Sequence, residues 1–237
     1  MKAMLFAAGL GSRLKPWTDH HPKALALVNG KSLLQRNVEY LLSFGINEII
    51  INVHHFADQI IDAIDNNKGW GADITISDET DVVLETGGGL KKAGWYFKEE
   101  NEFVVMNVDI LTKLDLAAMI ANHRASHALA TLAVSERETS RYFLFNDAGI
   151  LCGWKNTKTG EEKIVRPAAG YLSKAFSGVH VINSAIFHKI HQEGKFSMVD
   201  VYLDLAKNNI IRCFDHTGAV LIDVGKPESV TKAEQYF

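Results

Sequence analysis

The sequence predicts an α/β fold in which a Rossmann-like mixed, mostly parallel sheet is flanked by helices. In the first half, short apolar runs rich in β-branched residues alternate with amphipathic helical patterns, which is typical of parallel βαβ units in a sheet covered on both sides. The second half has closely spaced strand patterns, which indicate a small antiparallel elaboration. No linker, repeat or low-complexity segment interrupts the 237 residues, so we expect a single domain over 1–237.

The first half begins with a buried strand over residues 4–8. A helix over 32–44 follows, because Ser32 and Gln35 have the spacing of a capping box and Gly45 can end the helix. The remaining patterns of this half alternate in the same way. They predict strands over 48–53, 73–77 and 102–108, and helices over 57–66 and 115–125.

The second half contains more strands and fewer helices. A turn over 146–149, with the sequence N-D-A-G, predicts a hairpin between strands 142–145 and 150–154. The polar stretch 155–162 is expected to be an exposed loop. A helix over 197–207 has another cap-like start, at Ser197 and Asp200. Further strands are predicted over 129–134, 175–182, 210–214 and 219–224, with a last helix after Pro227.

Composition excludes several classes of function. The formal net charge of −3 argues against a broad nucleic-acid-binding face, so any attraction for anions has to be local. Cys152 and Cys213 are the only cysteines, which suits a reducing compartment better than a disulfide framework or a zinc site. No apolar run approaches the roughly 20 residues of a membrane helix. We expect a cytoplasmic protein without nucleic-acid or membrane partners.

A glycine turn follows the first predicted strand. Residues 5–16 read L-F-A-A-G-L-G-S-R-L-K-P. Closely spaced glycines let backbone N–H groups approach a phosphate, and the arginine can add a bidentate contact. The dinucleotide fingerprint G-x-G-x-x-G fails because Leu14 stands at its third glycine, and a P-loop ending in G-K-S at residue 32 fails because Leu25 stands at its first glycine. A different kind of phosphate-binding turn is expected.

Four motifs in order along the chain carry a resemblance to a known family. They are A-A-G-L-G-S-R-L-K-P-W-T with P-K-A-L-A-L-V-N-G-K at 7–31, E-T-G-G-G at 85–89, N-V-D at 107–109 and D-V-G-K-P-E at 223–228. Together they resemble the sugar-1-phosphate nucleotidylyltransferases, which make nucleotide sugars. The resemblance implies a nucleotide-diphospho-sugar transferase-like fold, with 1–125 mainly a nucleotide-binding half and 126–237 mainly a sugar-binding half. Longer members of the family append a second domain, and we expect none here because the sequence stops soon after Asp223.

The resemblance implies a reaction between two anions. A sugar 1-phosphate attacks the α-phosphorus of a nucleoside triphosphate and pyrophosphate leaves, so cations and positioning supply most of the catalysis. Asp109 and Asp223 are the expected Mg²⁺ ligands, because Mg²⁺ prefers oxygen and is commonly held by one or two carboxylates with phosphate oxygens. Arg13 is expected to stabilise the departing pyrophosphate, and Lys23 to lie against the α-phosphate or the sugar phosphate.

The remaining site residues also follow from the resemblance. The nucleotide is expected between the first turn and a glycine-rich loop at 85–89, on Ala8, Gly9, Gly11, Ser12, Arg13, Thr86, Gly87 and Gly88. Asn107 and Gly178 are the candidates for the sugar side. Many family members hold the sugar phosphate with the lysine of an E-K-P segment, but Glu162-Lys163 has no proline after it. Val108 replaces a frequent glycine beside Asp109.

The substrates stay open at this point. The motif wording is most similar to the branch that uses N-acetylmuramic acid 1-phosphate with UTP, and related branches use mannose 1-phosphate or heptose 1-phosphate with GTP. Alternative interpretations are a phosphocholine cytidylyltransferase and a catalytically silent nucleotide-sugar-binding regulator. The four residues Arg13, Lys23, Asp109 and Asp223 are all retained, which argues against the regulator. The oligomeric state is open between monomer and dimer.

Overall fold

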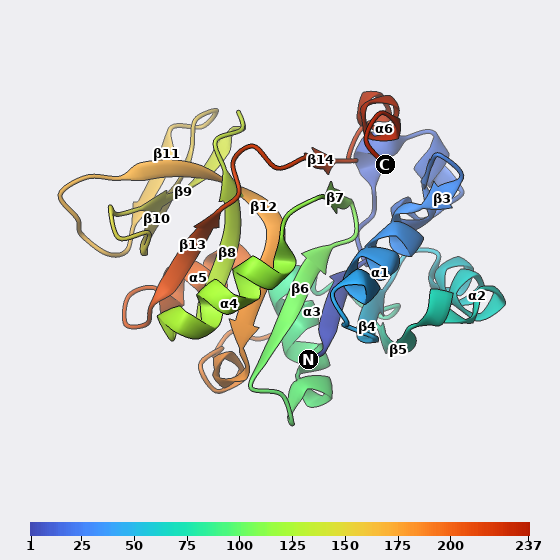
Figure 1. The fold of residues 1–237 in the computed structure, drawn as a ribbon, viewed down its shortest axis with the longest axis horizontal. Coiled ribbons are helices and arrows are strands. Elements are labelled where there is room, and N and C mark those ends of the chain that lie inside the picture. The colour runs from blue at the N-terminus through green and yellow to red at the C-terminus, as the bar shows by residue number, and fades with distance from the viewer.

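The computed structural model describes residues 1–237 and is built around one continuous ten-stranded sheet. The main strand order is β11-β10-β9-β12-β6-β1-β4-β5, and β8 and β13 branch from β12. These strands are β1 (Ala3–Phe6), β4 (Glu48–Val53), β5 (Asp73–Asp78), β6 (Glu102–Asn107), β8 (Ala130–Ser135), β9 (Arg141–Phe145), β10 (Leu151–Asn156), β11 (Glu161–Ile164), β12 (Leu172–Asn183) and β13 (Ile211–Asp215). The predicted mixed α/β class is confirmed (Figure 1).

The helices cover both faces of the sheet. They are α1 (Leu33–Ser43), α2 (Ala57–Asn66), α3 (Glu85–Lys92), α4 (Leu116–Ser126), α5 (Met198–Leu205) and α6 (Pro227–Glu234). Alternate residues of β1 point to opposite faces. Ala3 and Leu5 pack in a cluster with α1, α2 and α4, whereas Met4 and Phe6 pack in a cluster with α3 and α5. Figure 1 shows α1 and α4 in front of the sheet and α3 behind it.

The four central strands are parallel, and the strands added on the other side of β6 are mostly antiparallel. β6, β1, β4 and β5 run in one direction, with Phe6 opposite Asn107 at the end of the β1–β6 pair. β12 is antiparallel to β6, β8 and β9. The carboxyl ends of β1 and β6 therefore lie at one edge, where ligands of open α/β sheets bind.

Two small sheets lie beyond this edge. β7 (Ile110–Thr112) pairs antiparallel with β14 (Leu221–Asp223), and β2 (Leu27–Val28) pairs with β3 (Lys31–Ser32). A third apolar cluster, which includes Leu14, Leu111 and Ile222, joins them to α6. The short β7–β14 pair brings a segment from near the end of the sequence to the end of β6 (Figure 1).

Two local predictions are confirmed and two are wrong. Ser32 Oγ accepts the N–H of Gln35 and Ser197 Oγ accepts that of Asp200, as the capping patterns predict. Residues 155–162 are not one loop, because β10 continues to Asn156 and β11 begins at Glu161. β11 is exposed along its whole length, so it lacks the apolar alternation that reveals a strand. The 85–89 stretch is not a loop either, but the start of α3.

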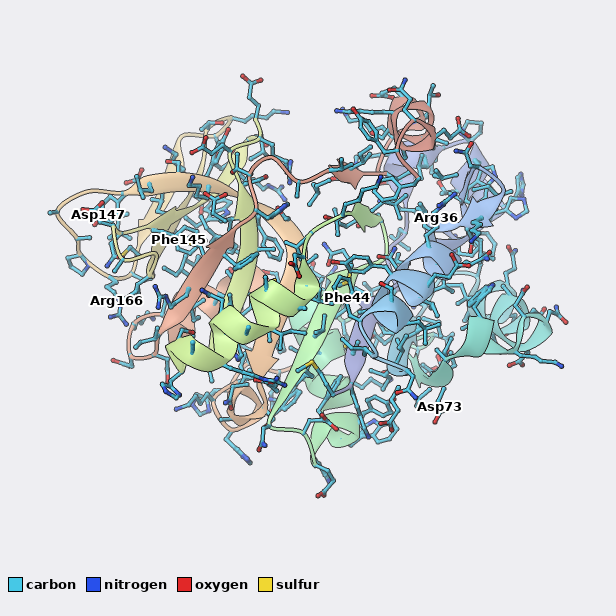
Figure 2. The ribbon with its side chains drawn as sticks, viewed as in Figure 1. Arg36, Phe44, Asp73, Phe145, Asp147 and Arg166 are labelled. Atoms are coloured by element: carbon cyan, nitrogen blue, oxygen red, sulfur yellow. The ribbon has the colours of Figure 1, made fainter.

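Side chains fill the space between the layers throughout the molecule (Figure 2). Phe145 on β9 is fully buried, whereas Asp147 lies in the exposed turn that follows it. Arg166 donates hydrogen bonds to the carbonyls of Ala206 and Asn209, which ties the segment after β11 to the end of α5. No helix is long and apolar enough to cross a membrane.

Candidate active site

The N-terminal turn is shaped by hydrogen bonds from neighbouring elements. Asn52, at the end of β4, accepts the N–H of Ala7 at 2.8 Å. Gly11 has φ 63°, and a Cβ there would lie 2.9 Å from Thr18 and 3.0 Å from Lys23. A Cβ on Gly9 would meet nothing within 4 Å, so the surface at this residue is open. Gly11 is therefore required by the fold of the turn, and Gly9 is free to face a ligand.

A cavity of about 250 Å³ lies between this turn and the end of β6. It gathers most of the predicted nucleotide, catalytic and metal residues. Its lining comprises Phe6, Ala7, Gly9, Gly11, Ser12, Arg13, Lys23, Thr86, Asn107, Val108, Asp109 and Gly225. Ala8 lines an adjoining cavity of about 160 Å³, which shares Phe6, Gly9 and Thr86 with the first. The two hollows form one candidate site at the carboxyl edge of the sheet.

Two ion pairs lie at the larger cavity. Arg13, Lys23 and Asp109 line it, whereas Asp223 is not in the lining and is reached through Arg13. The Lys23 ammonium pairs with Asp109, and these side chains are only 10% and 21% exposed. Arg13 Nη2 lies 3.9 Å from Asp223 Oδ1, in a more open position. Charges held at fixed positions in a partly desolvated site interact strongly with an anionic ligand. The arrangement presents positive charge from two sides to whatever occupies the cavity.

Asp109 and Asp223 are brought together by the β7–β14 pair. Asp223 pairs with Ile110, and the N–H of Val224 donates to the carbonyl of Asp109 at 2.8 Å. Asp223 Oδ1 is buried and has no hydrogen-bond partner. A Cβ on Gly225 would lie 2.6 Å from both that oxygen and Arg13 Nη2, so the close approach needs a glycine.

These two carboxylates fit a Mg²⁺ ion that a substrate also coordinates. No group of three or more His, Cys, Asp or Glu residues lies together in the protein. A complete protein cage is thus not formed, but Mg²⁺ is usually bound by one or two carboxylates with phosphate oxygens and water. The unpartnered buried oxygen of Asp223 supports this fit, because a buried acceptor without a donor is costly unless a ligand satisfies it.

The glycines at 87–89 have a packing role. A Cβ on Gly87 would lie 2.4 Å from the Phe196 ring, and one on Gly88 would lie 2.3 Å from the Gly194 carbonyl oxygen. The N–H groups of Gly87 and Gly88 both donate to the carbonyl of Phe196. Glycine is therefore needed for the close contact between α3 and the 194–196 segment. Of the predicted stretch, only Glu85 and Thr86 line the cavities.

The two sugar-side candidates lie next to each other. Gly178 has φ 73°, and a Cβ there would lie 3.1 Å from Asn107 Nδ2 and 2.7 Å from Ile110. Asn107 lines the larger cavity and Gly178 does not. Lys163, the nearest match to the family's lysine, lies on the outermost strand β11, where it pairs with Glu161. It lies far along the sheet from β6 and is not part of this site.

Three supporting polar residues were missed by the sequence patterns. Asn52 donates to Glu79 Oε1 at 2.8 Å while it holds Ala7, and burial raises the pKa of the Glu79 carboxyl. Asn37 on α1 is 2% exposed and donates to the carbonyls of Leu33 and Val108, each at 2.9 Å. The sequence did offer a signal for the two asparagines, because Asn52 lies near the end of an apolar strand and Asn37 on the apolar face of a helix.

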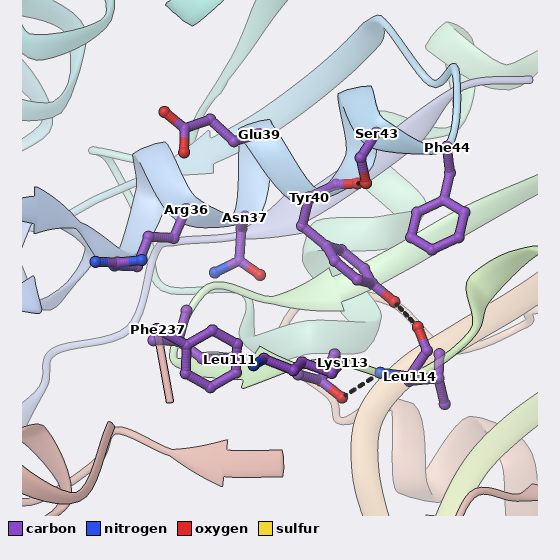
Figure 3. A pocket seen from close by; sticks show the side chains of 11 residues that line it. Arg36, Asn37, Glu39, Tyr40, Ser43, Phe44, Leu111, Lys113, Leu114 and Phe237 are labelled. Atoms are coloured by element: carbon purple, nitrogen blue, oxygen red, sulfur yellow. Dashed lines mark hydrogen bonds between the residues drawn. The ribbon is translucent and has the colours of Figure 1, made fainter. Parts of the chain in front are cut away.

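Asn37 links the active site to a hollow on its far side. This cavity of about 410 Å³ lies between α1 and β7, and its lining includes Arg36, Tyr40 and Lys113. Figure 3 shows Asn37 projecting from α1 toward β7, and the Tyr40 hydroxyl donating to the carbonyl of Leu114. The carbonyl held by Asn37 belongs to the residue before Asp109, so α1 fixes the backbone that carries this carboxylate.

Comparisons with known proteins agree with this geometry. Residues 2–237 match the nucleotidyl transferase family. The chain is 30% identical to N-acetylmuramate alpha-1-phosphate uridylyltransferase of Neisseria meningitidis serogroup B, covering 95% of this chain and 93% of that protein. It is also 30% identical to D-glycero-alpha-D-manno-heptose 1-phosphate guanylyltransferase of Aneurinibacillus thermoaerophilus, covering 99% and 97%.

A solved structure extends the similarity to three dimensions. HddC from Yersinia pseudotuberculosis, complexed with GMP-PN, superposes with a TM-score of 0.79 at 25% identity, covering 99% of this chain and 98% of that one. The chain spans only about 62% of the length of the matching mannose-1-phosphate guanyltransferase of Schizosaccharomyces pombe.

Proposed function

The chain belongs to the nucleotidyl transferase family, and on that premise we propose that it joins a nucleoside triphosphate to a sugar 1-phosphate. An oxygen of the sugar phosphate attacks the α-phosphorus and forms a new P–O bond. The bond from the α-phosphorus to the oxygen bridging to the β-phosphate breaks, and pyrophosphate leaves with that electron pair. The products are a nucleotide sugar and pyrophosphate.

One observation carries this proposal. Arg13, Lys23, Asp109 and Asp223, which are far apart in the sequence, converge at the carboxyl edge of β1 and β6. Joining two phosphates requires charge neutralisation around both. This cavity offers two cations, with Asp109 in its lining and Asp223 beside Arg13 as the proposed metal ligands. An ordinary strand-to-helix turn would need none of these groups together.

The residues take separate roles in this proposal. Arg13, in the open part of the cavity, binds the β- and γ-phosphates and stabilises the departing pyrophosphate. Lys23 is held at the cavity wall by Asp109 and donates to the α-phosphate. Gly9, Gly11 and Ser12 supply the backbone and hydroxyl of the phosphate turn, and the base lies toward the adjoining cavity of Ala8 and Thr86.

Asp109 and Asp223 hold Mg²⁺ in the proposal. When bound, the ion neutralises charge on the phosphate oxygens and orients them for in-line displacement. The β7–β14 pair sets the spacing of the two carboxylates, and the Asn37 contact holds the backbone before Asp109.

The leading substrate pair is N-acetylmuramic acid 1-phosphate with UTP, and the second is mannose or heptose 1-phosphate with GTP. A relative of each kind, uridylyl and guanylyl, matches over nearly the whole chain at equal identity. The E-T-G-G-G sequence at 85–89 favours N-acetylmuramic acid 1-phosphate with UTP.

A substrate matrix tests the proposed function. UTP, GTP, CTP, ATP and dTTP are each combined with the three sugar 1-phosphates and with phosphocholine in the presence of Mg²⁺, and pyrophosphate is measured. We expect release only when a triphosphate and a sugar 1-phosphate are both present. Pyrophosphate release only in the combination of phosphocholine with CTP would indicate a phosphocholine cytidylyltransferase instead. Tight nucleotide binding without turnover in any combination would indicate a regulator.

A further inference from the structure

The sugar half of the site has an unusual irregularity in β12. Phe176 pairs with Val134 of β8, but the next paired residue is His180, which lies opposite Leu132. Two residues of β8 therefore span the same length as four of β12, and the extra backbone arches out of the sheet. Gly178 lies in this arch with φ 73°, beside Asn107. The arch is thus a wall at the end of β6.

The residues after β8 lie at the same edge of the sheet. β12 is antiparallel to both β6 and β8, so β8 runs in the direction of β6 and its carboxyl end points toward the same edge as Asn107. Arg137 follows the last residue of β8 by two positions. Its Nη2 donates to the carbonyl of Phe176 at 2.8 Å, directly before the arch.

Arg137 carries a charge that no carboxylate of the protein neutralises. It forms no ion pair, and its Nε is buried without a hydrogen-bond partner. Lys174, in the same region, differs because it is bound between Glu136 and Asp215 at 2.8 and 2.7 Å. A partly buried guanidinium with unused donors is a strong binder of a phosphate dianion, whose geometry it matches.

The neighbouring histidine adds no competing charge. His216 is 8% exposed, and its Nε2 lies 2.7 Å from Ser177 Oγ in the arch. Burial lowers the pKa of the His216 imidazole; the Asp215 carboxylate opposes this shift and the nearby Arg137 adds to it. The imidazole is neutral near pH 7, and Arg137 remains the cation that lies against the arch.

We propose that Arg137 binds the phosphate of the sugar 1-phosphate at the arch of β12, in the role that the distant Lys163 cannot fill. This inference rests on the proposed function. Arg13, in the lining of the larger cavity, then serves the triphosphate, and Arg137, at the arch beside Asn107, serves the acceptor. Arg137 holds the attacking phosphate by its non-reacting oxygens, and the guanidinium keeps all its protons during the reaction.

Steady-state kinetics of Arg137→Met and Arg137→Lys test the assignment. The acceptor is whichever sugar 1-phosphate the wild type uses in the substrate matrix. We expect Arg137→Met to raise the KM for that sugar phosphate by about 10- to 100-fold, as loss of a charge-assisted phosphate contact predicts. The KM for the nucleoside triphosphate should change less than about twofold. Arg137→Lys keeps the positive charge but loses the two-pronged guanidinium. Its KM for the sugar phosphate should lie between those of the wild type and Arg137→Met.

Arg212 provides the matched control. Its Nη2 also donates to one carbonyl, that of Ala148, and its Nε is also buried without a partner. It lies at the start of β13, which is parallel to β8, and therefore at the opposite edge of the sheet. Arg212→Met should leave both KM values as in the wild type, even where it lowers the melting temperature to the same extent as Arg137→Met.

Two results would overturn the inference. The first is that Arg137→Met changes both KM values equally or lowers only kcat, which would mean that Arg137 only anchors Phe176. A rise in the sugar-phosphate KM with Arg141→Met but not with Arg137→Met would assign the anion to the exposed first residue of β9. Failure of the proposed function itself is distinguishable, because it appears in the wild type as no turnover with any sugar 1-phosphate.

Discussion

The two carboxylates of the proposed metal position differ in their surroundings. Asp109 pairs with Lys23 and is 21% exposed, whereas Asp223 has one buried oxygen without a partner. Asp109 holds the Lys23 ammonium in place, and in the proposed function both carboxylates also hold the metal ion. Charge at these two positions should therefore matter to catalysis much more than to folding.

Replacing either carboxylate by the amide tests this difference. Asp109→Asn and Asp223→Asn should each lower kcat/KM on the order of 100-fold or more, because an interaction with the transferring phosphate is lost. Neither should lower the melting temperature by more than a few degrees. Asp62→Asn, at an exposed position of α2, is the control. Activity within twofold of the wild type in either amide variant would refute the metal assignment.

Buried histidines link the stability of the protein to pH. His180 is 2% exposed and its Nδ1 lies 2.6 Å from the Tyr202 hydroxyl. Burial lowers the pKa of its imidazole to about 3, and burial also lowers the pKa values of His123 and His216. Below about pH 6.5 the unfolded chain takes up a proton at each of these positions before the folded protein does, and for His180 the folded protein stays unprotonated down to about pH 3.

The free energy of unfolding should consequently fall as the pH drops from about 6.5 toward 3. Each such histidine contributes a slope of up to ~1.4 kcal/mol per pH unit. His180→Gln should show a shallower fall than the wild type in urea titrations at pH 7, 6 and 5. His191→Gln, at an exposed position, is the matched control. Parallel curves for His180→Gln and the wild type would contradict the assignment.

At the scale of elements, the glycines of the first turn and of α3 serve different purposes. A Cβ on Gly9 meets nothing within 4 Å, whereas one on Gly87 would overlap the Phe196 ring. Gly9→Ala should fold normally and raise the KM for the triphosphate, because the methyl group enters the cavity. Gly87→Ala should lose about 1–3 kcal/mol of stability through overpacking.

Thermal unfolding and triphosphate KM, measured on both variants, separate the two effects. Gly87→Ala combined with Phe196→Leu should recover part of the lost stability, since the smaller side chain makes room at the contact. If Gly9→Ala were the less stable variant and Gly87→Ala the one with altered KM, the roles given to the two glycines would be reversed.

Elements with their own apolar pattern could be predicted from the sequence. The strand over 48–53 and the helix over 57–66 agree with the structure at both ends. β11 could not be predicted, because its exposed residues Glu161–Ile164 become a strand only by pairing with β10. α3 was hidden for another reason: glycines disfavour a helix locally. Only tertiary contacts require them, with Gly87 and Gly88 against the 194–196 segment and Gly89 against Glu79 and Asn52.

The candidate site was predictable in its charged residues and not in its supports. Arg13, Lys23 and Asp109 belong to motifs with a chemical meaning, and they meet in one cavity. Asn37 and Asn52 act through backbone groups of distant residues, which no local pattern can reveal. The same holds for Arg137, whose significance depends on the arch in another strand.

At the scale of the whole molecule, the two halves of the chain form one core. Met4 and Phe6 from the first half pack in the same cluster as Phe145, Ile182 and Tyr202 from the second. β12 also pairs directly with β6. The division into a nucleotide half and a sugar half remains a functional proposal, but the packing does not divide at residue 125.

A fragment experiment tests this unity. Residues 1–125 expressed alone should lack a cooperative urea transition, because β6 loses its β12 partner and one face of the sheet loses α5. The full chain should unfold in one transition by both fluorescence and circular dichroism. A cooperative transition in the fragment, or two transitions in the full chain, would show independent halves.

The strand pair β7–β14 has a consequence for synthesis of the protein on the ribosome. Asp109, Lys23 and Arg13 emerge early, but Asp223 reaches them only after β14 has been translated and has paired with β7. With the roles proposed for these residues, a nascent or prematurely terminated chain has the triphosphate turn without its second carboxylate. With these roles, the proposed metal position is completed only when β14 pairs with β7, after most of the 237 residues have been translated.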